Sequence, residues 1–207
     1  LKMVLPDADT EIREYLGLIE TEANNAATIV SDLLDYGRIK TSDRKPVQVK
    51  TLIEASLVKI PVPEGVLVDC EIPEDITPVW VDQQQIDLIL NNLVVNAYQA
   101  MPDGGKLLIS CEQYAGHSRE SHEGEGQPRC WVRICVRDTG TGITVENMAK
   151  LFEPLFTTKH RGIGLGLATS KNLAEVNGGY IEVASQVGEG TSFTLHMPCQ
   201  EAAPSES

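Results

Sequence analysis

One carboxylate and two glycines stand together in the run Asp138-Thr139-Gly140-Thr141-Gly142-Ile143. The apolar residues Trp131, Ile134 and Val136 precede it and predict a strand that ends at Asp138. A carboxylate at a strand end can accept a hydrogen bond from an adenine amino group, and glycines let the backbone pass close to a ring. Asp-Thr-Gly alone is more typical of a capped turn, so the interpretation depends on the other segments.

Asn92 and Asn96 lie four residues apart in a helix that the sequence predicts over residues 82–101, so they share one face. The apolar positions of this helix lie toward the core: Ile86, Ile89, Leu93, Ala97 and Ala100. An amide oxygen is a hard ligand suited to Mg²⁺, which needs few protein ligands when triphosphate oxygens and water complete its octahedron. From spacing alone, surface asparagines with no ligand are the simpler explanation.

Three alternate glycines, Gly162, Gly164 and Gly166, stand at the start of a helix predicted over residues 164–176. Free N–H groups and the positive end of a helix dipole bind phosphates there. A lone Gly-x-Gly-x-Gly pattern is a weak signal, and its weight comes from the helix that follows it.

The segment before these glycines, residues 152–159, is predicted to form a lid over the phosphates. It ends on Lys159, whose ammonium group would neutralise a γ-phosphate, although a solvated lysine is the plain alternative. Phe152, Leu155 and Phe156 are predicted to anchor the lid on the core when it closes, not to contact a ligand.

Taken in order, these segments resemble the ATP-binding domain of two-component sensor histidine kinases, a branch of the ATPase group that also holds DNA gyrase B and MutL. The resemblance covers about residues 45–198. It implies that ATP and Mg²⁺ bind, with Asn96 as the metal ligand and Ile143 packed on the adenine. The implied cofactor-binding residues are Asp138, Gly140, Gly142, Ile143, Gly162, Gly164, Leu165, Gly166 and Thr191, and the implied catalytic residues are Asn92, Asn96 and Lys159.

Two positions depart from patterns in this ATPase group. Gyrase- and MutL-like enzymes carry a water-activating glutamate one turn before the Mg²⁺ asparagine, and this chain carries Asn92 there. Because an amide does not accept a proton near neutral pH, Asn92 predicts phosphoryl transfer in preference to hydrolysis. Gln99 stands where many relatives carry a basic phosphate contact, so the grip on phosphate is expected to rest on Lys159 and lid amides.

The remaining periodicity predicts an α+β fold, a two-layer α/β sandwich with helices on one face of a mixed sheet. The resemblance implies that this sandwich is the Bergerat-type ATP-binding fold. A further helix is predicted over residues 51–60. The predicted strands are residues 45–49, 66–72, 77–81, 106–114, 130–138, 180–186 and 191–197.

A coiled-coil-like helix is predicted before the sandwich, because apolar residues recur at alternating spacings of four and three. These residues are Ile12, Leu16, Ile19, Ala23, Ala26, Val30, Leu33 and Gly37. The stripe needs a partner helix, which implies a homodimer through this helix in the full-length protein. The predicted domains are a partial dimerisation hairpin over residues 1–40, an ATP-binding domain over 45–198 and a disordered tail over 199–207.

The net charge of −13 argues against nonspecific binding of nucleic acid, which needs a basic surface. No apolar run is long enough for a membrane span and no signal sequence is present, so membrane contact by this chain is not expected. The five cysteines show no CxxC pair and predict reduced thiols in the cytoplasm. We expect a cytoplasmic fragment of a longer protein, whether or not that protein is anchored to a membrane.

None of the histidines lies on a predicted bundle helix: His117, His122, His160 and His196. The resemblance therefore implies a histidine kinase catalytic domain whose acceptor histidine lies outside this chain and whose phosphoryl group passes on to a response regulator receiver domain. Two alternatives stay open. One is an ATPase or protein serine kinase of the same superfamily, and the other is a nucleotide-binding scaffold without transfer activity.

Overall fold

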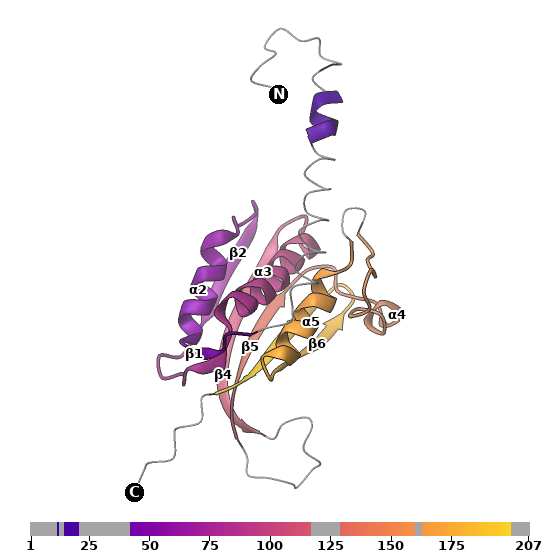
Figure 1. The fold of residues 1–207 in the computed structure, drawn as a ribbon. Coiled ribbons are helices and arrows are strands. Elements are labelled where there is room, and N and C mark those ends of the chain that lie inside the picture. Colours follow the sequence, from indigo (N-terminus) through magenta and orange to yellow (C-terminus); the bar gives the residue numbers. More distant parts are fainter. Residues whose placement is uncertain (1–11, 13–14, 21–41, 117–128, 160–162, 200–207) are drawn as a thin grey trace, which may run out of the picture.

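The computed structural model describes residue 12 and residues 15–20, 42–116, 129–159 and 163–199. Three helices, α2, α3 and α5, cover one face of the main sheet, and the short helix α4 lies to one side (Figure 1). The helices are α2 (Val49–Lys59), α3 (Gln83–Ala100), α4 (Val145–Met148) and α5 (Gly166–Val176). The strands are β1 (Lys45–Val47), β2 (Val66–Glu71), β3 (Val79–Val81), β4 (Gly105–Gly116), β5 (Arg129–Asp138), β6 (Tyr180–Gln186) and β7 (Gly190–Pro198).

The main sheet is mixed, with the order β2-β4-β5-β7-β6. Strands β2 and β4 pair in parallel, and the other neighbours pair antiparallel. Strands β1 and β3 form a separate antiparallel pair. This arrangement confirms the predicted α+β sandwich with helices on one face.

Helix α3 is the central element of the helical layer. Its N-cap Asp82 accepts from the backbone N–H groups of Gln84 and Gln85, which satisfies two amides of the first turn. Its buried side chains follow the helical period and face the sheet: Ile86, Ile89, Leu90, Leu93, Val94, Ala97 and Tyr98. The predicted core positions are therefore confirmed except for Ala100, which is half-buried, while the opposite face stays available for polar contacts.

A buried asparagine joins the C-terminal end of α5 to the N-terminal end of α3. Asn177, the fully buried C-cap of α5, accepts from Asp82 N at 2.8 Å. Its amide nitrogen donates to Gln85 Oε1 and to Leu173 O, each at 2.8 Å. The last turn of α5 is thus fixed to the first turn of α3.

The predicted dimerisation helix falls mostly outside the described residues. Residues 15–20 are helical, in agreement with the heptad pattern. Ile12 and Ile19 are 48% and 58% exposed, and Tyr15 and Leu18 outside the stripe are as exposed, at 58% and 57%, so the coiled coil stays a prediction. No helix in the described part of the chain is long and apolar enough to cross a membrane.

The prediction that all five cysteines are reduced is wrong for two of them. Cys130 and Cys199 form a disulfide, with Cα atoms 5.3 Å apart. The backbone N–H of Cys199 also donates to Cys130 O, so the two residues are neighbours across adjacent strands of the sheet. Their separation of 69 residues conceals this proximity in the sequence. Cys199 was assigned to the predicted tail. In the structure it belongs to the fold and forms an isolated antiparallel β-bridge with Val79.

Most element bounds differ from prediction by a few residues, and one helix was not predicted. Helix α4 begins after its N-cap Thr144, whose side chain accepts from Asn147 N. Its four residues are too few to show a helical period. Strands β4 and β5 are longer than the predicted strands 106–114 and 130–138, because β4 extends from Gly105 to Gly116 and β5 begins at Arg129.

The buried contacts of Asn177 lead to a stability prediction. Asn177→Ala leaves the Asp82 N–H and the Gln85 amide without their partner, so the free energy of unfolding is expected to fall by about 2 to 4 kcal/mol. Urea unfolding followed by circular dichroism measures this change. The control Glu175→Ala removes an exposed side chain from the same helix and is expected to change stability by less than about 0.5 kcal/mol. Equal stability of the two variants would contradict the proposed role of Asn177.

Candidate functional site

Asp138 is the last residue of β5, as predicted, and only 2% of it is exposed. Its Oδ1 accepts from Gly140 N at 2.8 Å and from Thr191 N at 3.2 Å. Burial raises the pKa of Asp138, and the two backbone donors partly oppose that rise. Because both donors go to Oδ1, the carboxylate is fixed in orientation, which suits it to accept a bond from a ligand through Oδ2.

The glycines around Asp138 are needed for backbone packing. Gly142 has a φ of +69°, and a side chain there would overlap the carbonyl of Gln186. Gly190 has a φ of +113°, and a side chain there would overlap the carbonyl of Asp138. The sequence interpretation expected glycines to admit a ligand ring. In the structure Gly142 admits the backbone of the β6–β7 hairpin, and Gly140 admits Ala100 of α3.

Ser185 connects three parts of this region and was not predicted from the sequence. Its Oγ accepts from Ile143 N at 2.9 Å, donates to Gly190 O at 2.9 Å and contacts Thr191 Oγ1 at 3.0 Å. A serine in a strand carries no sequence signal of this kind, because the contact depends on how the hairpin meets the loop after β5. Ile143 and Thr191 are thereby held beside Asp138, close to where the resemblance implies the adenine.

Asn92 lies at the contact between α3 and α5. Its amide nitrogen donates to Gly166 O at 2.6 Å and to Ser170 Oγ at 3.2 Å. A side chain on Gly166 would meet the Asn92 amide at 2.6 Å, so this glycine keeps the two helices close. Asn92 therefore positions the first turn of α5.

The first turn of α5 has the character of an anion site. Leu165 stands at the N-cap, makes no side-chain capping bond and is 3% exposed, so its side chain belongs to the core. The first turn also has no acidic residue. Its N–H groups and the helix dipole therefore remain suited to phosphate oxygens. Gly164 precedes this turn, and Gly162 lies outside the described residues.

The segment before the glycines contacts them through its backbone. Leu155 N donates to Gly164 O at 3.0 Å. Phe152 packs against the core, as predicted, and Phe156 is half-buried. Leu155 is 65% exposed and does not pack on the core in this structure, so its anchoring on lid closure stays a prediction. Its φ of +68° turns the side chain away from the core, and within the described residues Leu155 is the only non-glycine residue with a positive φ.

Asn96 and Lys159 are brought together as the candidate phosphate and metal end of the site. Lys159 Nζ donates to Asn96 Oδ1 at 2.6 Å and to Gln99 Oε1 at 2.5 Å. Although much of the lysine is accessible to solvent, desolvation of its ammonium group lowers the pKa of Lys159. Gln99, noted in the sequence only as a departure, is thus a direct partner of Lys159.

The donor chemistry of Asn96 fits Mg²⁺. Its Oδ1 already attracts a cation, the ammonium group of Lys159. Within the described residues, no group of three or more His, Cys, Asp or Glu side chains could hold a metal ion. An amide oxygen is a ligand that suits a metal which takes its other ligands from phosphate and water, as Mg²⁺ does.

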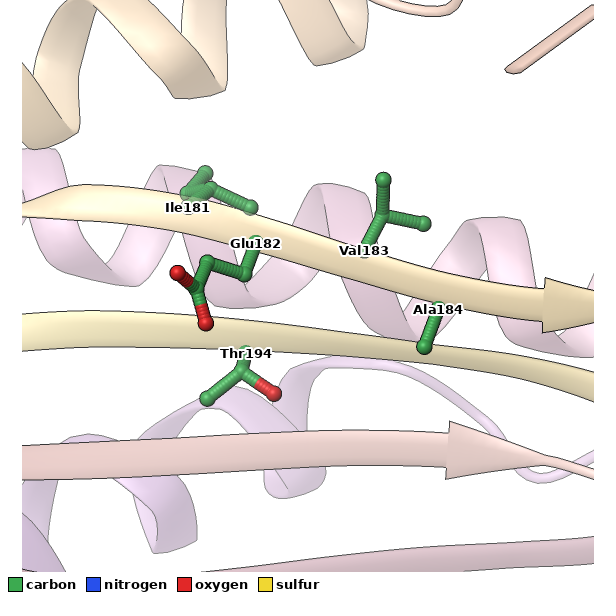
Figure 2. Close-up of a pocket in the computed structure, with 5 residues that line it drawn as sticks. All are labelled: Ile181, Glu182, Val183, Ala184 and Thr194. Carbon is green, nitrogen blue, oxygen red and sulfur yellow. The ribbon is translucent and has the colours of Figure 1, made fainter.

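A hollow of about 420 Å³ lies elsewhere, along the edge strand β6. Figure 2 shows Glu182, Ala184 and Thr194 pointing to one side of the sheet there, while Ile181 and Val183 point to the other. None of the predicted site residues lines it. The side chains that line the hollow alternate between the two faces of the sheet, as in any strand, so we do not assign a ligand to it.

Comparisons with known proteins agree with this geometry. Residues 81–201, more than half of the chain, match the family described as histidine kinase-, DNA gyrase B- and HSP90-like ATPase. The signal transduction histidine-protein kinase AtoS of Escherichia coli (strain K12) is 31% identical over 189 residues, which cover 90% of this chain and 29% of AtoS. The chain thus spans less than a third of that relative.

Two solved structures share the fold. The catalytic domain of histidine kinase ThkA is 26% identical, with a TM-score of 0.61, over 76% of this chain and 96% of that one. Full-length ShkA in complex with AMPPNP is 23% identical, with a TM-score of 0.73, over 96% of this chain and 41% of that one. The chain therefore belongs to the histidine kinase-, DNA gyrase B- and HSP90-like ATPase family and, within it, to the ATP-binding catalytic domains of sensor histidine kinases.

Proposed function

We propose that this chain binds ATP with Mg²⁺ and transfers the γ-phosphoryl group to a histidine on a dimerisation hairpin. The phosphoryl group would then pass to an aspartate of a response regulator receiver domain. The full-length protein would be a homodimer through the predicted N-terminal helix. We also propose the division into a dimerisation region over residues 1–40, a catalytic domain over 45–198 and a tail.

One observation carries this proposal: α3 contacts three segments in turn along its length. Asn92 contacts Gly166 at the start of α5. Asn96, one turn later, contacts Lys159. One further turn on, at the end of α3, the backbone carbonyl of Ala100 accepts from Thr141 N in the loop after Asp138. Positions four apart lie on one line of a helix, and these three span about 12 Å. This order supports a nucleotide site whose phosphate, cation and adenine ends lie along α3.

The chain's residues would act mainly by positioning and by neutralising charge. Asp138 would accept a hydrogen bond from the adenine amino group, and Ile143 would pack on the ring. The first N–H groups of α5 would bind phosphate oxygens, and Lys159 would offset negative charge as the phosphoryl group leaves. Mg²⁺ held by Asn96 would supply further neutralisation of the phosphate oxygens.

Asn92 favours transfer over hydrolysis. Its amide nitrogen is engaged as a donor to Gly166 O and Ser170 Oγ, and an amide is no base near neutral pH. An acceptor histidine therefore has no competitor for the γ-phosphoryl group in the form of a water activated at this position. The ATPase alternative and the alternative of a scaffold without transfer activity each make a different prediction in the experiment below.

The decisive test mixes the chain with γ-labelled ATP, Mg²⁺ and a separately produced hairpin that carries an acceptor histidine. We expect acid-labile label on the hairpin, and we expect Asn96→Ala to reduce it by at least about tenfold because the metal ligand is lost. Label and free phosphate are measured together.

Asn91→Ala is the matched control for this experiment. Asn91 is the preceding residue of α3, but its Oδ1 accepts from Ser56 Oγ at 2.8 Å in the contact with α2. We expect this variant to retain transfer. Free phosphate without label would instead establish an ATPase, and ATP binding without either product would establish a nucleotide-binding scaffold.

The orientation of Asp138 predicts a change in base preference. In Asp138→Asn, the amide oxygen can still accept from Gly140 and Thr191, but the amide nitrogen would face the adenine amino group. We expect ATP affinity to fall by about tenfold or more, with ITP now preferred, because the 6-oxo group of ITP accepts a hydrogen bond. Calorimetric titration of both nucleotides measures the preference.

Stability is not expected to account for this change. Since burial raises the pKa of Asp138, the charged form carries a desolvation cost that asparagine does not. The control Asp69→Asn alters an exposed carboxylate on β2 and is expected to keep the preference for ATP. A similar preference for ATP in both variants would show that Asp138 does not contact the base.

A further inference from the structure

The ammonium group of Lys159 lies against the side chain that the proposed function assigns to Mg²⁺. Lys159 Nζ donates to Asn96 Oδ1 at 2.6 Å and to Gln99 Oε1 at 2.5 Å. Among the ion pairs of the described residues, none involves Lys159. Its positive charge is therefore held by two neutral amide oxygens, the kind of ligand that also binds a hard metal ion.

The end of α3 strengthens this attraction. Asn96 and Gln99 lie near the C-terminus of α3, which ends at Ala100 and has no basic residue in its last turn. Carbonyl groups at a helix C-terminus carry partial negative charge and attract a cation. Lys159, sixty residues beyond Gln99, supplies the cation that α3 itself lacks.

We propose that Lys159 occupies the metal ligand Asn96 in the nucleotide-free chain, and that Gln99 is the positioning residue that holds Lys159 there. When metal and nucleotide bind, Lys159 releases Asn96 Oδ1 and turns to the phosphate oxygens. Gln99 keeps the lysine at the end of α3 during this exchange. The inference rests on the proposed function, because the metal assignment of Asn96 belongs to it.

A cation tethered to the metal ligand alters the metal dependence of nucleotide binding. Without Mg²⁺, Lys159 already offers a positive charge to the triphosphate. With Mg²⁺, Lys159 must first leave Asn96. Both effects bring the ATP affinity without Mg²⁺ closer to the ATP affinity with Mg²⁺. A lysine that contacted only phosphate would instead raise these two affinities by the same factor. The ratio of the two affinities therefore separates the two roles.

The first experiment measures the dissociation constant of ATP by calorimetry, once in excess Mg²⁺ and once in EDTA. The ratio of the EDTA value to the Mg²⁺ value is expected to rise at least about fivefold in Lys159→Met. Gln99→Leu is expected to raise the ratio in the same direction by a smaller factor. Lys150→Met removes an exposed lysine from the preceding segment and is expected to leave the ratio unchanged.

The outcomes distinguish the inference from the function beneath it. If Lys159→Met weakens binding equally in both conditions, Lys159 is only a phosphate contact and the exchange is wrong. If the wild-type chain binds no ATP in either condition, the proposed function is wrong. Thermal unfolding of each variant establishes that the fold is retained.

A second experiment needs no nucleotide and measures hydrogen exchange of residues 153–159. Leu155 N donates to Gly164 O at 3.0 Å, and Lys159 N donates to Thr157 Oγ1 at 3.1 Å. Lys159→Met and Gln99→Leu are each expected to speed exchange of these amides, because the side-chain attachment to α3 is lost. The double variant is expected to exchange no faster than Lys159→Met alone, since both changes remove one interaction. Unchanged exchange in both single variants would overturn the holding role of Gln99.

Discussion

Burial of the Asp138 carboxylate is the constraint on which the nucleotide end of this fold depends. A buried carboxylate is costly unless hydrogen-bond donors compensate it. The donors here are backbone N–H groups of Gly140 and Thr191, which come from two separate segments. Both segments must approach Asp138 with their backbones, which is why Gly190 lies against the Asp138 carbonyl. The residue that would select the base therefore also joins the loop after β5 to the β6–β7 hairpin.

Helix α3 imposes the second constraint, because its two faces have different tasks. One face is buried in the core and fixes the rotation of the helix against the sheet. The other carries Asn92, Asn96 and Gln99 toward α5 and the segment that ends at Lys159. A rotation of α3 would disturb core packing and site geometry together. The geometry of the site is thus stabilised by the same apolar burial that stabilises the domain.

The sequence predicted what depends on local periodicity and not what depends on the meeting of distant segments. The core face of α3 and the strand that ends at Asp138 followed from helical and alternating patterns. The contacts of Ser185 did not, since they depend on how the β6–β7 hairpin meets the loop after β5. The Cys130–Cys199 disulfide did not either, since it depends on β5 and β7 being neighbours in the sheet. The asparagine pair was noticed by its spacing. The contacts of Asn92 with α5 and of Asn96 with Lys159 were not predicted.

Asn92 shows why transfer and hydrolysis are alternatives at this position. Its amide nitrogen donates to the carbonyl of Gly166 at the start of α5. A glutamate, the water-activating residue of the gyrase- and MutL-like enzymes, has no proton to donate to that carbonyl when ionised. It would also place negative charge beside a carbonyl oxygen. In this packing, a side chain that ties α3 to α5 cannot also be the base that activates water, which supports the proposed transfer of the phosphoryl group to another acceptor.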